Sequence, residues 1–294
     1  MLRSITAIAA ALAVAIAIPA AAAPQPVAPA ATPFRLGALH LYALSDMANV
    51  VPNDNSVFGA DQTPAAVAGV LKAAGAPTDH IALGVDALLV VAPGHVVLID
   101  TGLGPKVGGV LMRSLAKTGI APDKVTDVLI THSHGDHIGG LLTAEGKPAF
   151  PNATIHMSAT EWQWLQSHKS AAPIVAAIRA QVKPFAPGGA VLPGITSVAL
   201  PGHTPGHVGY RIASKGQHLL DIGDTAHSAI VSLARPDWPI GYDNDAKQGE
   251  ATRAHLLGEL ARSHERIFAP HFSYPGVGTI VAKGNGYAFK PSLP

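Results

Sequence analysis

Three histidines and one aspartate lie within six consecutive residues of the stretch 131–137, which reads Thr-His-Ser-His-Gly-Asp-His. Imidazole nitrogens and carboxylate oxygens are ligands that zinc and similar cations bind in proteins. His132 and His134 alternate as residues do at the end of a strand, whereas Asp136 and His137 fall in the first turn of the next element. This spacing predicts two adjacent metal sites. The alternative is a polar loop that is rich in histidine by chance, in a chain with 15 histidines.

The stretch lies between two apolar segments, residues 125–130 and 138–142, so we expect it to join a buried strand to a helix. A metal site needs more ligands than this loop supplies. Three further candidates, His203, Asp224 and His271, each follow an apolar segment that reads as a strand. The sequence therefore predicts a site that is assembled from the ends of several strands.

The elements that must position these residues alternate between strand groups and helices. We expect strands over 39–44, 85–91, 95–101, 125–131, 153–157, 195–200, 207–213, 217–223 and 265–269, and a terminal hairpin over 278–290. Helices are expected over 64–74, 105–118 and 246–262, and one more begins at Ser158, where Glu161 would complete a capping box. Residues 46–59 read as a polar loop. Two halves that each end in histidine-bearing loops fit two sheets with helices packed outside.

Composition excludes several classes of function. The chain has 294 residues, of which 48% are hydrophobic, enough for one large domain or two small ones. A formal net charge of +1 indicates no broad basic surface for nucleic acid. The chain contains no cysteine, which excludes disulfides, thiol nucleophiles and thiolate metal ligands.

The N-terminus has the pattern of a secretory signal peptide over residues 1–22. Arg3 is followed by an apolar run over 5–18, then by Pro19 and the small residues 20–23. A membrane anchor is the alternative, but this run is short of the about 20 apolar residues that a spanning helix needs. We therefore expect a periplasmic or secreted protein without a stable membrane anchor.

Two further segments complete the expected organisation. Residues 23–33 form a proline- and alanine-rich tether that is extended or disordered. Residues 34–294 form the folded domain.

The order of candidate ligands resembles that of the metallo-β-lactamase superfamily, whose hydrolases carry His-x-His-x-Asp-His, then a histidine, a bridging aspartate and a final histidine. A closer similarity to methyl parathion hydrolases and lactonase-like enzymes extends from about residue 34 to the C-terminus. It rests on Ala43-Leu44-Ser45-Asp46, Ile99-Asp100-Thr101-Gly102, Ile130-Thr131-His132, Phe150-Pro151-Asn152-Ala153, His203-Thr204-Pro205-Gly206-His207, Gly223-Asp224 and Tyr274-Pro275-Gly276-Val277-Gly278.

The resemblance implies an α/β fold of the four-layer αββα sandwich type with two divalent metal ions. One ion would be bound by His132, His134 and His203, the second by Asp136, His137 and His271, with Asp224 bridging both. Asp221 is the competing carboxylate, but strand parity turns it away from Asp224. Zinc suits such nitrogen and oxygen ligands, and manganese, cobalt or iron could occupy the same residues.

Two cations about 3.5 to 4 Å apart share a water, lower its pKa and polarise the carbonyl or phosphoryl oxygen that it attacks. Asp136 is then a candidate proton shuttle. Asp100 resembles the aspartate that orients a ligand histidine in this family, and an ordinary cap of the strand end is the alternative. His207 is expected to support the site rather than bind metal.

Two features bear on the substrate. His227 occupies the position, three residues after the bridging aspartate, where acyl-homoserine lactonases commonly have a tyrosine, so it either donates a hydrogen bond to the substrate or is a surface histidine. Neutral esters also bind largely through hydrophobic walls. The candidates for such a pocket, each of which could instead belong to the core, are Phe58, Trp164, Phe185, Trp238 and Phe272.

The leading hypothesis is an exported, dinuclear metal-dependent hydrolase that attacks small neutral esters, lactones or phosphotriesters with a hydroxide bridging the metals. The resemblance also makes a homodimer plausible. A β-lactamase is one alternative, although the missing cysteine and the bridging Asp224 disfavour it. The alternative from another class is a catalytically silent metal-binding module, which the presence of all seven ligand positions disfavours.

Overall fold

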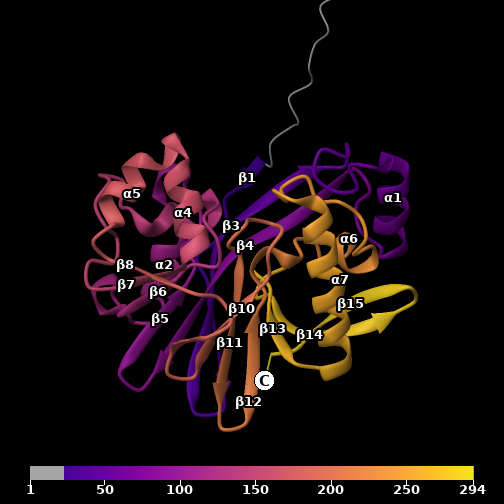
Figure 1. Cartoon of the computed structure of the whole chain (residues 1–294). Coiled ribbons are helices and arrows are strands. Elements are labelled where there is room, and N and C mark those ends of the chain that lie inside the picture. Colours follow the sequence, from indigo (N-terminus) through magenta and orange to yellow (C-terminus); the bar gives the residue numbers. More distant parts are fainter. Residues whose placement is uncertain (1–22, 294) are drawn as a thin grey trace, which may run out of the picture.

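Alternating apolar residues in the strands let two β-sheets pack face to face in the computed structural model, which describes residues 23–293. Leu88 and Val90 point into the core between the two sheets, whereas Ala87 and Leu89 point to the opposite side of their own sheet. Helices cover both outer sides, α2, α4 and α5 on one and α1, α6 and α7 on the other (Figure 1). The structure thus confirms the expected four-layer αββα sandwich.

The first sheet runs in the order β1-β3-β4-β5-β6-β7-β8, and β2 pairs with β3. Its strands are β1 (Ala23–Gln25), β2 (Ala31–Leu36), β3 (Leu39–Pro52), β4 (His80–Ala92), β5 (His95–Ile99), β6 (Asp127–Leu129), β7 (Thr154–Ser158) and β8 (Val182–Phe185).

The second sheet runs in the order β15-β14-β13-β12-β11-β10-β9. Its strands are β9 (Ala190–Leu192), β10 (Ile195–Ala199), β11 (Val208–Ser214), β12 (Gln217–Asp221), β13 (Arg266–Phe268), β14 (Val277–Lys283) and β15 (Gly286–Pro291).

The helices are α1 (Pro64–Ala73), α2 (Leu111–Ala116), α3 (Gly135–Ile138), α4 (Ala159–Ser167), α5 (Ala172–Ile178), α6 (Val231–Ala234) and α7 (Ala246–Ser263). Short 3₁₀ helices are η1 (Pro105–Val107), η2 (Pro122–Lys124), η3 (Gly139–Leu141), η4 (Lys169–Ala171) and η5 (Gly223–Thr225).

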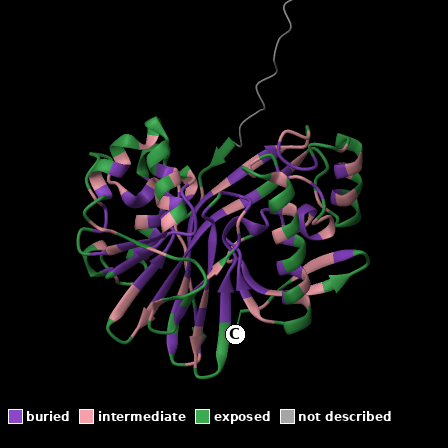
Figure 2. Cartoon of the chain, in the orientation of Figure 1, coloured by how far each residue is buried: buried purple, intermediate pink, exposed green. Residues whose placement is uncertain are grey.

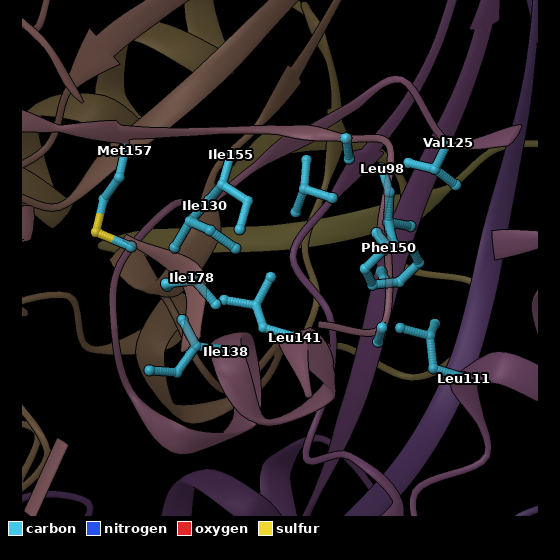
Figure 3. Close-up of a cluster of buried hydrophobic side chains, with 14 of the residues drawn as sticks. Leu98, Leu111, Val125, Ile130, Ile138, Leu141, Phe150, Ile155, Met157 and Ile178 are labelled. Carbon is cyan, nitrogen blue, oxygen red and sulfur yellow. The ribbon is translucent and has the colours of Figure 1, made fainter. Parts of the chain in front are cut away.

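The outer helices are amphipathic and close a core on each side of the sandwich. Ile138, Leu141 and Ile178, from α3, η3 and α5, pack with Leu98 and Ile155 of the first sheet (Figure 3). On the other side Leu256, Leu257 and Leu260 of α7 pack with residues of the second sheet. Burial is accordingly concentrated in the strands and the inward helix faces, while the outward faces are exposed (Figure 2).

Most expected elements are present, including the terminal hairpin and α1, whose N-cap Thr63 accepts a hydrogen bond from the Ala66 N–H. The helix expected over 105–118 is instead broken into η1 and α2. Here the carboxylate of Asp46 accepts hydrogen bonds from the backbone N–H groups of Leu103 and Leu111, which pulls this segment toward β3. Propensity alone gave no sign of that tertiary contact.

The N-terminal part of the sheet extends beyond what the sequence predicted. Strand β3 continues to Pro52, through much of the stretch that reads as a polar loop. Residues 23–25 form β1 and residues 31–33 begin β2, so part of the expected tether is paired with β3, ahead of the expected domain start at residue 34. The expected signal peptide, residues 1–22, lies outside the described residues. Among residues 23–293, none of the helices has the length and apolar character that crossing a membrane requires.

Candidate metal centre

All predicted ligands except His203 follow parallel strands, whose carboxyl ends meet at the same edge of a sheet. Strands β5, β6 and β7 are mutually parallel, and the stretch 131–137 follows β6. In the second sheet β12 and β13 are parallel, and Asp224 and His271 follow them. His203 lies in the loop between β10 and β11. Because the two sheets face each other, these loops converge on one site.

The structure brings all seven predicted ligands together in two sets that meet at Asp224. One potential ligand atom of each residue in the set His132, His134, His203 and Asp224 lies within 4.8 Å of the others, and the same holds for Asp136, His137 and His271. The Oδ2 atom of Asp224 is 3.2 Å from His203 Nε2 and 3.0 Å from His271 Nε2, and its Oδ1 atom is 3.2 Å from His137 Nε2. Asp224 therefore stands between the two sets, where a bridging ligand would have to be.

Asp221, the competing carboxylate, takes no part in this cluster. Its Oδ1 atom accepts a hydrogen bond from the backbone N–H of Gly223, 3.0 Å away, which shapes the turn that leads to Asp224. The backbone N–H of Asp224 donates to Nε2 of His207, and Nδ1 of His207 donates to the Leu200 carbonyl. Burial lowers the pKa of His207 to about 3, so its imidazole remains neutral and can accept that bond. His207 thus supports the site as expected.

Three of the ligand histidines are fixed through the ring nitrogen that faces away from the cluster. His137 Nδ1 donates to Asp100 Oδ2 at 2.8 Å, His203 Nδ1 donates to Asp243 Oδ1 at 2.9 Å, and His271 Nδ1 donates to the Gly84 carbonyl at 2.7 Å. Each bond directs Nε2 of that histidine toward the cluster, as metal-binding histidines require.

Asp100 both orients a ligand histidine and caps a strand end, the two alternatives that the sequence left open. Besides orienting His137, it accepts hydrogen bonds from the backbone N–H and the hydroxyl of Thr131 at the end of β6. Asp243 was not predicted, because it lies just before Asp245, the N-cap of α7, and locally resembles a helix-capping residue.

Glu161 holds the two histidine-bearing loops together. Ser158 caps α4 as expected, accepting a hydrogen bond from the Glu161 N–H, but the Glu161 carboxylate does not complete the capping box. One of its oxygens accepts from the backbone N–H and hydroxyl of Ser133, and the other from the Thr204 hydroxyl and the Gly206 N–H. The loop that carries His132 and His134 is thereby tied to the loop that carries His203.

The electrostatics of the cluster suit a cation. Burial alone would lower the pKa of His203, but Asp224 and Asp243 raise it to about 9. Burial alone would raise the pKa of Asp224, but the surrounding histidines, His137 foremost, hold it well below its ordinary range. His137 Nε2 and Asp224 Oδ1 are buried, and neither has a hydrogen-bond partner among the described residues. Buried nitrogen and oxygen donors without partners fit divalent metal ions of the zinc type.

A cavity of about 370 Å³ opens onto these donors. Some of the predicted metal ligands line this cavity. The other lining residues are Asn49, Leu83, Gly135, His227 and Tyr242.

None of the five aromatic residues predicted for the substrate pocket lines this cavity, and four of them are used for packing. Phe58 and Trp238 lie in the core beside α1, and Phe272 packs against Phe289 beneath the second sheet. Phe185 packs against Tyr210 in the core between the sheets. Trp164 does not line the cavity either, although its ring centroid is 5.8 Å from that of His134.

His227 is buried at the cavity and is not a surface histidine, which removes one of the two readings. Its ring stacks on His271, with centroids 5.1 Å apart and an interplanar angle of 7°. Its Nε2 atom lies 3.1 Å from Asp224 Oδ2, without the geometry of a hydrogen bond. Burial lowers the pKa of His227 to about 4.

Replacing Glu161 by glutamine tests the link between the two loops. Each oxygen of the Glu161 carboxylate accepts from one backbone N–H and one hydroxyl. In glutamine an NH₂ group replaces one of these oxygens, so one such pair of donors loses its acceptor. We therefore expect the free energy of unfolding to fall by at least about 2 kcal/mol. Urea denaturation measures this, and the exposed Gln163→Ala variant of the same helix should stay within about 0.5 kcal/mol of wild type. Equal stability of Glu161→Gln and wild type would show that the carboxylate does not carry the link.

Comparison with known proteins agrees with this geometry. The family described as the metallo-beta-lactamase superfamily matches residues 80–271. The uncharacterized protein YobT of Bacillus subtilis is 30% identical over 194 residues, which cover 61% of this chain and 80% of YobT. Metallo-beta-lactamase domain-containing protein 1 of Mus musculus is 45% identical over 62 residues, but that match spans only 21% of either protein.

Two solved structures resemble the whole sandwich. The dizinc quorum-quenching lactonase AidC, in complex with a product, N-hexanoyl-L-homoserine, aligns with a TM-score of 0.84 at 28% identity, over 90% of this chain and 98% of AidC. The hydrolase AbOPH, of the beta lactamase superfamily, aligns with a TM-score of 0.83 at 28% identity, over 91% and 99%. Fold, site and sequence agree, and this chain belongs to the metallo-β-lactamase superfamily of metal-dependent hydrolases.

Proposed function

We propose that this chain is a dinuclear hydrolase that opens small ester and lactone bonds, with lactones as the preferred class and phosphotriesters as a further one. The observation that carries the proposal is that two donor sets meet at Asp224 beneath one open cavity. The similarity to the lactonase AidC over 90% of the chain supports lactones.

In this proposal His132, His134 and His203 hold one cation, Asp136, His137 and His271 the other, and Asp224 contacts both. Zinc is the expected metal for these donors, with manganese, cobalt or iron able to replace it. Two such cations supply an activated water and polarise the oxygen of the bond under attack.

The chain itself supplies proton transfer and orientation. The side chain of Asp136 is 22% exposed and lines the cavity, so it can exchange a proton with a bound molecule. Burial alone would raise its pKa, but His137 and His271 lower it, which keeps Asp136 an acceptor. His227 has two ring nitrogens without a hydrogen-bond partner in residues 23–293, and one of them can donate to an oxygen of the substrate.

A panel of substrates on metal-reconstituted protein tests the proposed reaction. We expect lactones to be hydrolysed with the highest kcat/KM, aryl esters and phosphotriesters such as paraoxon more slowly, and the β-lactam nitrocefin slowest. The bridging position of Asp224 and the absence of thiolate ligands underlie this order. Nitrocefin turnover faster than that of all other substrates would make the protein a β-lactamase and overturn the proposal.

Replacing His134 by alanine tests whether the cluster is catalytic. Because His134 belongs to the first donor set, we expect both bound metal and hydrolysis to fall, hydrolysis by more than the about 10- to 100-fold typical of residues that only support a metal ligand. Elemental analysis and lactone turnover measure the two effects. The matched variant is His255→Ala, since this histidine is exposed on α7.

Unchanged hydrolysis in His134→Ala would contradict a catalytic cluster. Less than one metal ion per chain in the wild type would favour a silent module instead.

We also propose that the protein is exported, on the sequence pattern of residues 1–22. Fractionation of expressing bacteria should recover the mature protein in the periplasm or the medium, with an N-terminus near Ala23. Retention of the full-length chain in the cytoplasm would contradict export. A homodimer remains part of the proposal, and light scattering of the purified protein would measure it.

A further inference from the structure

His227 has a buried imidazole, and neither of its ring nitrogens has a hydrogen-bond partner among residues 23–293. A buried polar atom without a partner costs about 1–3 kcal/mol, so native proteins seldom keep two on one side chain without a use. Two atoms of the predicted metal donors, His137 Nε2 and Asp224 Oδ1, are buried and lack partners in the same way. His227 therefore shares with these donors the property that makes them fit a cation.

The distances from His227 to its neighbours fit a further ligand of the second metal ion, the one assigned to Asp136, His137 and His271. One ring nitrogen of His227 lies within 4.8 Å of potential ligand atoms of both Asp224 and His271. Its Nε2 atom is 3.1 Å from Asp224 Oδ2, and His271 Nε2 is 3.0 Å from the same oxygen. Two ligands of one tetrahedral zinc ion stand about 3.3 Å apart when each lies about 2.0–2.1 Å from the ion. The three side chains thus have the spacing of ligands that share one ion.

The contact between His227 and Asp224 needs a cation to be favourable. A neutral imidazole carries a hydrogen on one ring nitrogen and a lone pair on the other. Because the contact of Nε2 with Asp224 Oδ2 lacks the geometry of a hydrogen bond, a hydrogen on Nε2 would gain little there. A lone pair on Nε2 would instead face a carboxylate oxygen, which is repulsive unless a cation lies between them. Nδ1 then carries the hydrogen and keeps its capacity to donate to a substrate oxygen.

Packing holds the imidazole of His227 in this orientation. Its ring stacks on that of His271 at an interplanar angle of 7°. The ring centroids of His203 and Tyr242 lie 4.9 and 5.6 Å from its own. The hydroxyl of the next residue, Ser228, accepts hydrogen bonds from two backbone N–H groups at the start of α6. A side chain that is held in place before the ion arrives loses little conformational entropy on binding.

We propose that His227 is a metal ligand whose Nε2 atom binds the second ion together with Asp136, His137, His271 and Asp224. This inference rests on the proposed function, because it requires the two-metal centre, and it adds a donor that the predicted sets do not contain. The expected effect of this additional donor is that the second ion is retained more firmly.

Two substitutions of His227 separate metal binding from other roles. His227→Phe keeps an aromatic ring without nitrogen, and His227→Gln keeps a side-chain N–H that can donate to a substrate. We expect both variants to bind the second ion at least about tenfold more weakly than wild type, and the first ion within about threefold. Stepwise addition of Co²⁺ to the metal-free protein, with absorption spectra and chelator competition, measures the two affinities. The matched variant Tyr242→Phe alters the same cavity beside His227 and should leave both affinities unchanged.

Nuclear magnetic resonance tests the contact directly. In protein labelled with ¹⁵N-histidine and loaded with ¹¹³Cd²⁺, a nitrogen that binds the metal shows a scalar coupling to cadmium. We expect such a coupling for Nε2 of His227, in a signal that disappears in His227→Gln.

Different failures have different meanings. If His227→Gln binds both ions as tightly as wild type, or if His227 shows no coupling to cadmium, His227 is not a ligand while the proposed function stands. If the wild type binds fewer than two ions per chain, the proposed function fails and this inference fails with it.

Discussion

The carboxylate of Asp224 is the point on which the rest of the site depends. It is buried and lies within 3.2 Å of ring nitrogens of His137, His203 and His271. Among the described residues, the groups that stabilise its negative charge are imidazoles. A buried carboxylate without such partners would be very costly. The site must therefore assemble completely, from both sheets, or Asp224 loses its compensation.

Hydrogen bonds from residues behind the metal donors hold those donors in place. Asp100, Asp243 and the Gly84 carbonyl each fix one histidine, and His207 fixes the backbone of Asp224 itself. Glu161 ties the loop after β6 to the loop after β10. These contacts cross between segments that are far apart in sequence, so metal donors supplied by loops keep the precision of a rigid scaffold.

Local patterns were sufficient to predict two sheets with helices outside and a site built from several strand ends, and the family resemblance added the four-layer sandwich and the two sets of metal donors. An apolar strand that ends in a histidine or aspartate can be read without knowledge of its neighbours. Asp243 and Glu161 could not be read in this way, since each looks like a helix-capping residue until its tertiary partner is known. The position of Asn49 in the cavity lining could not be predicted for another reason. Asn49 lies in a stretch that reads as a loop but continues as β3.

Four of the five predicted pocket aromatics are absent from the cavity lining for a related physical reason. Large aromatic side chains bury the most apolar area, so a fold of this size uses them in its cores, and the open cavity is left to smaller and more polar residues. Besides the predicted metal donors, the cavity is lined by the polar side chains of Asn49, His227 and Tyr242, so its wall is not purely apolar.

Whether Asp224 joins two metal sites into one centre can be measured on the metal-free protein, by titration with Co²⁺ followed by electron paramagnetic resonance. We expect two ions to bind per chain and their spins to be magnetically coupled, because they share a ligand. Saturation at one ion, or two ions that behave independently, would contradict a bridging Asp224.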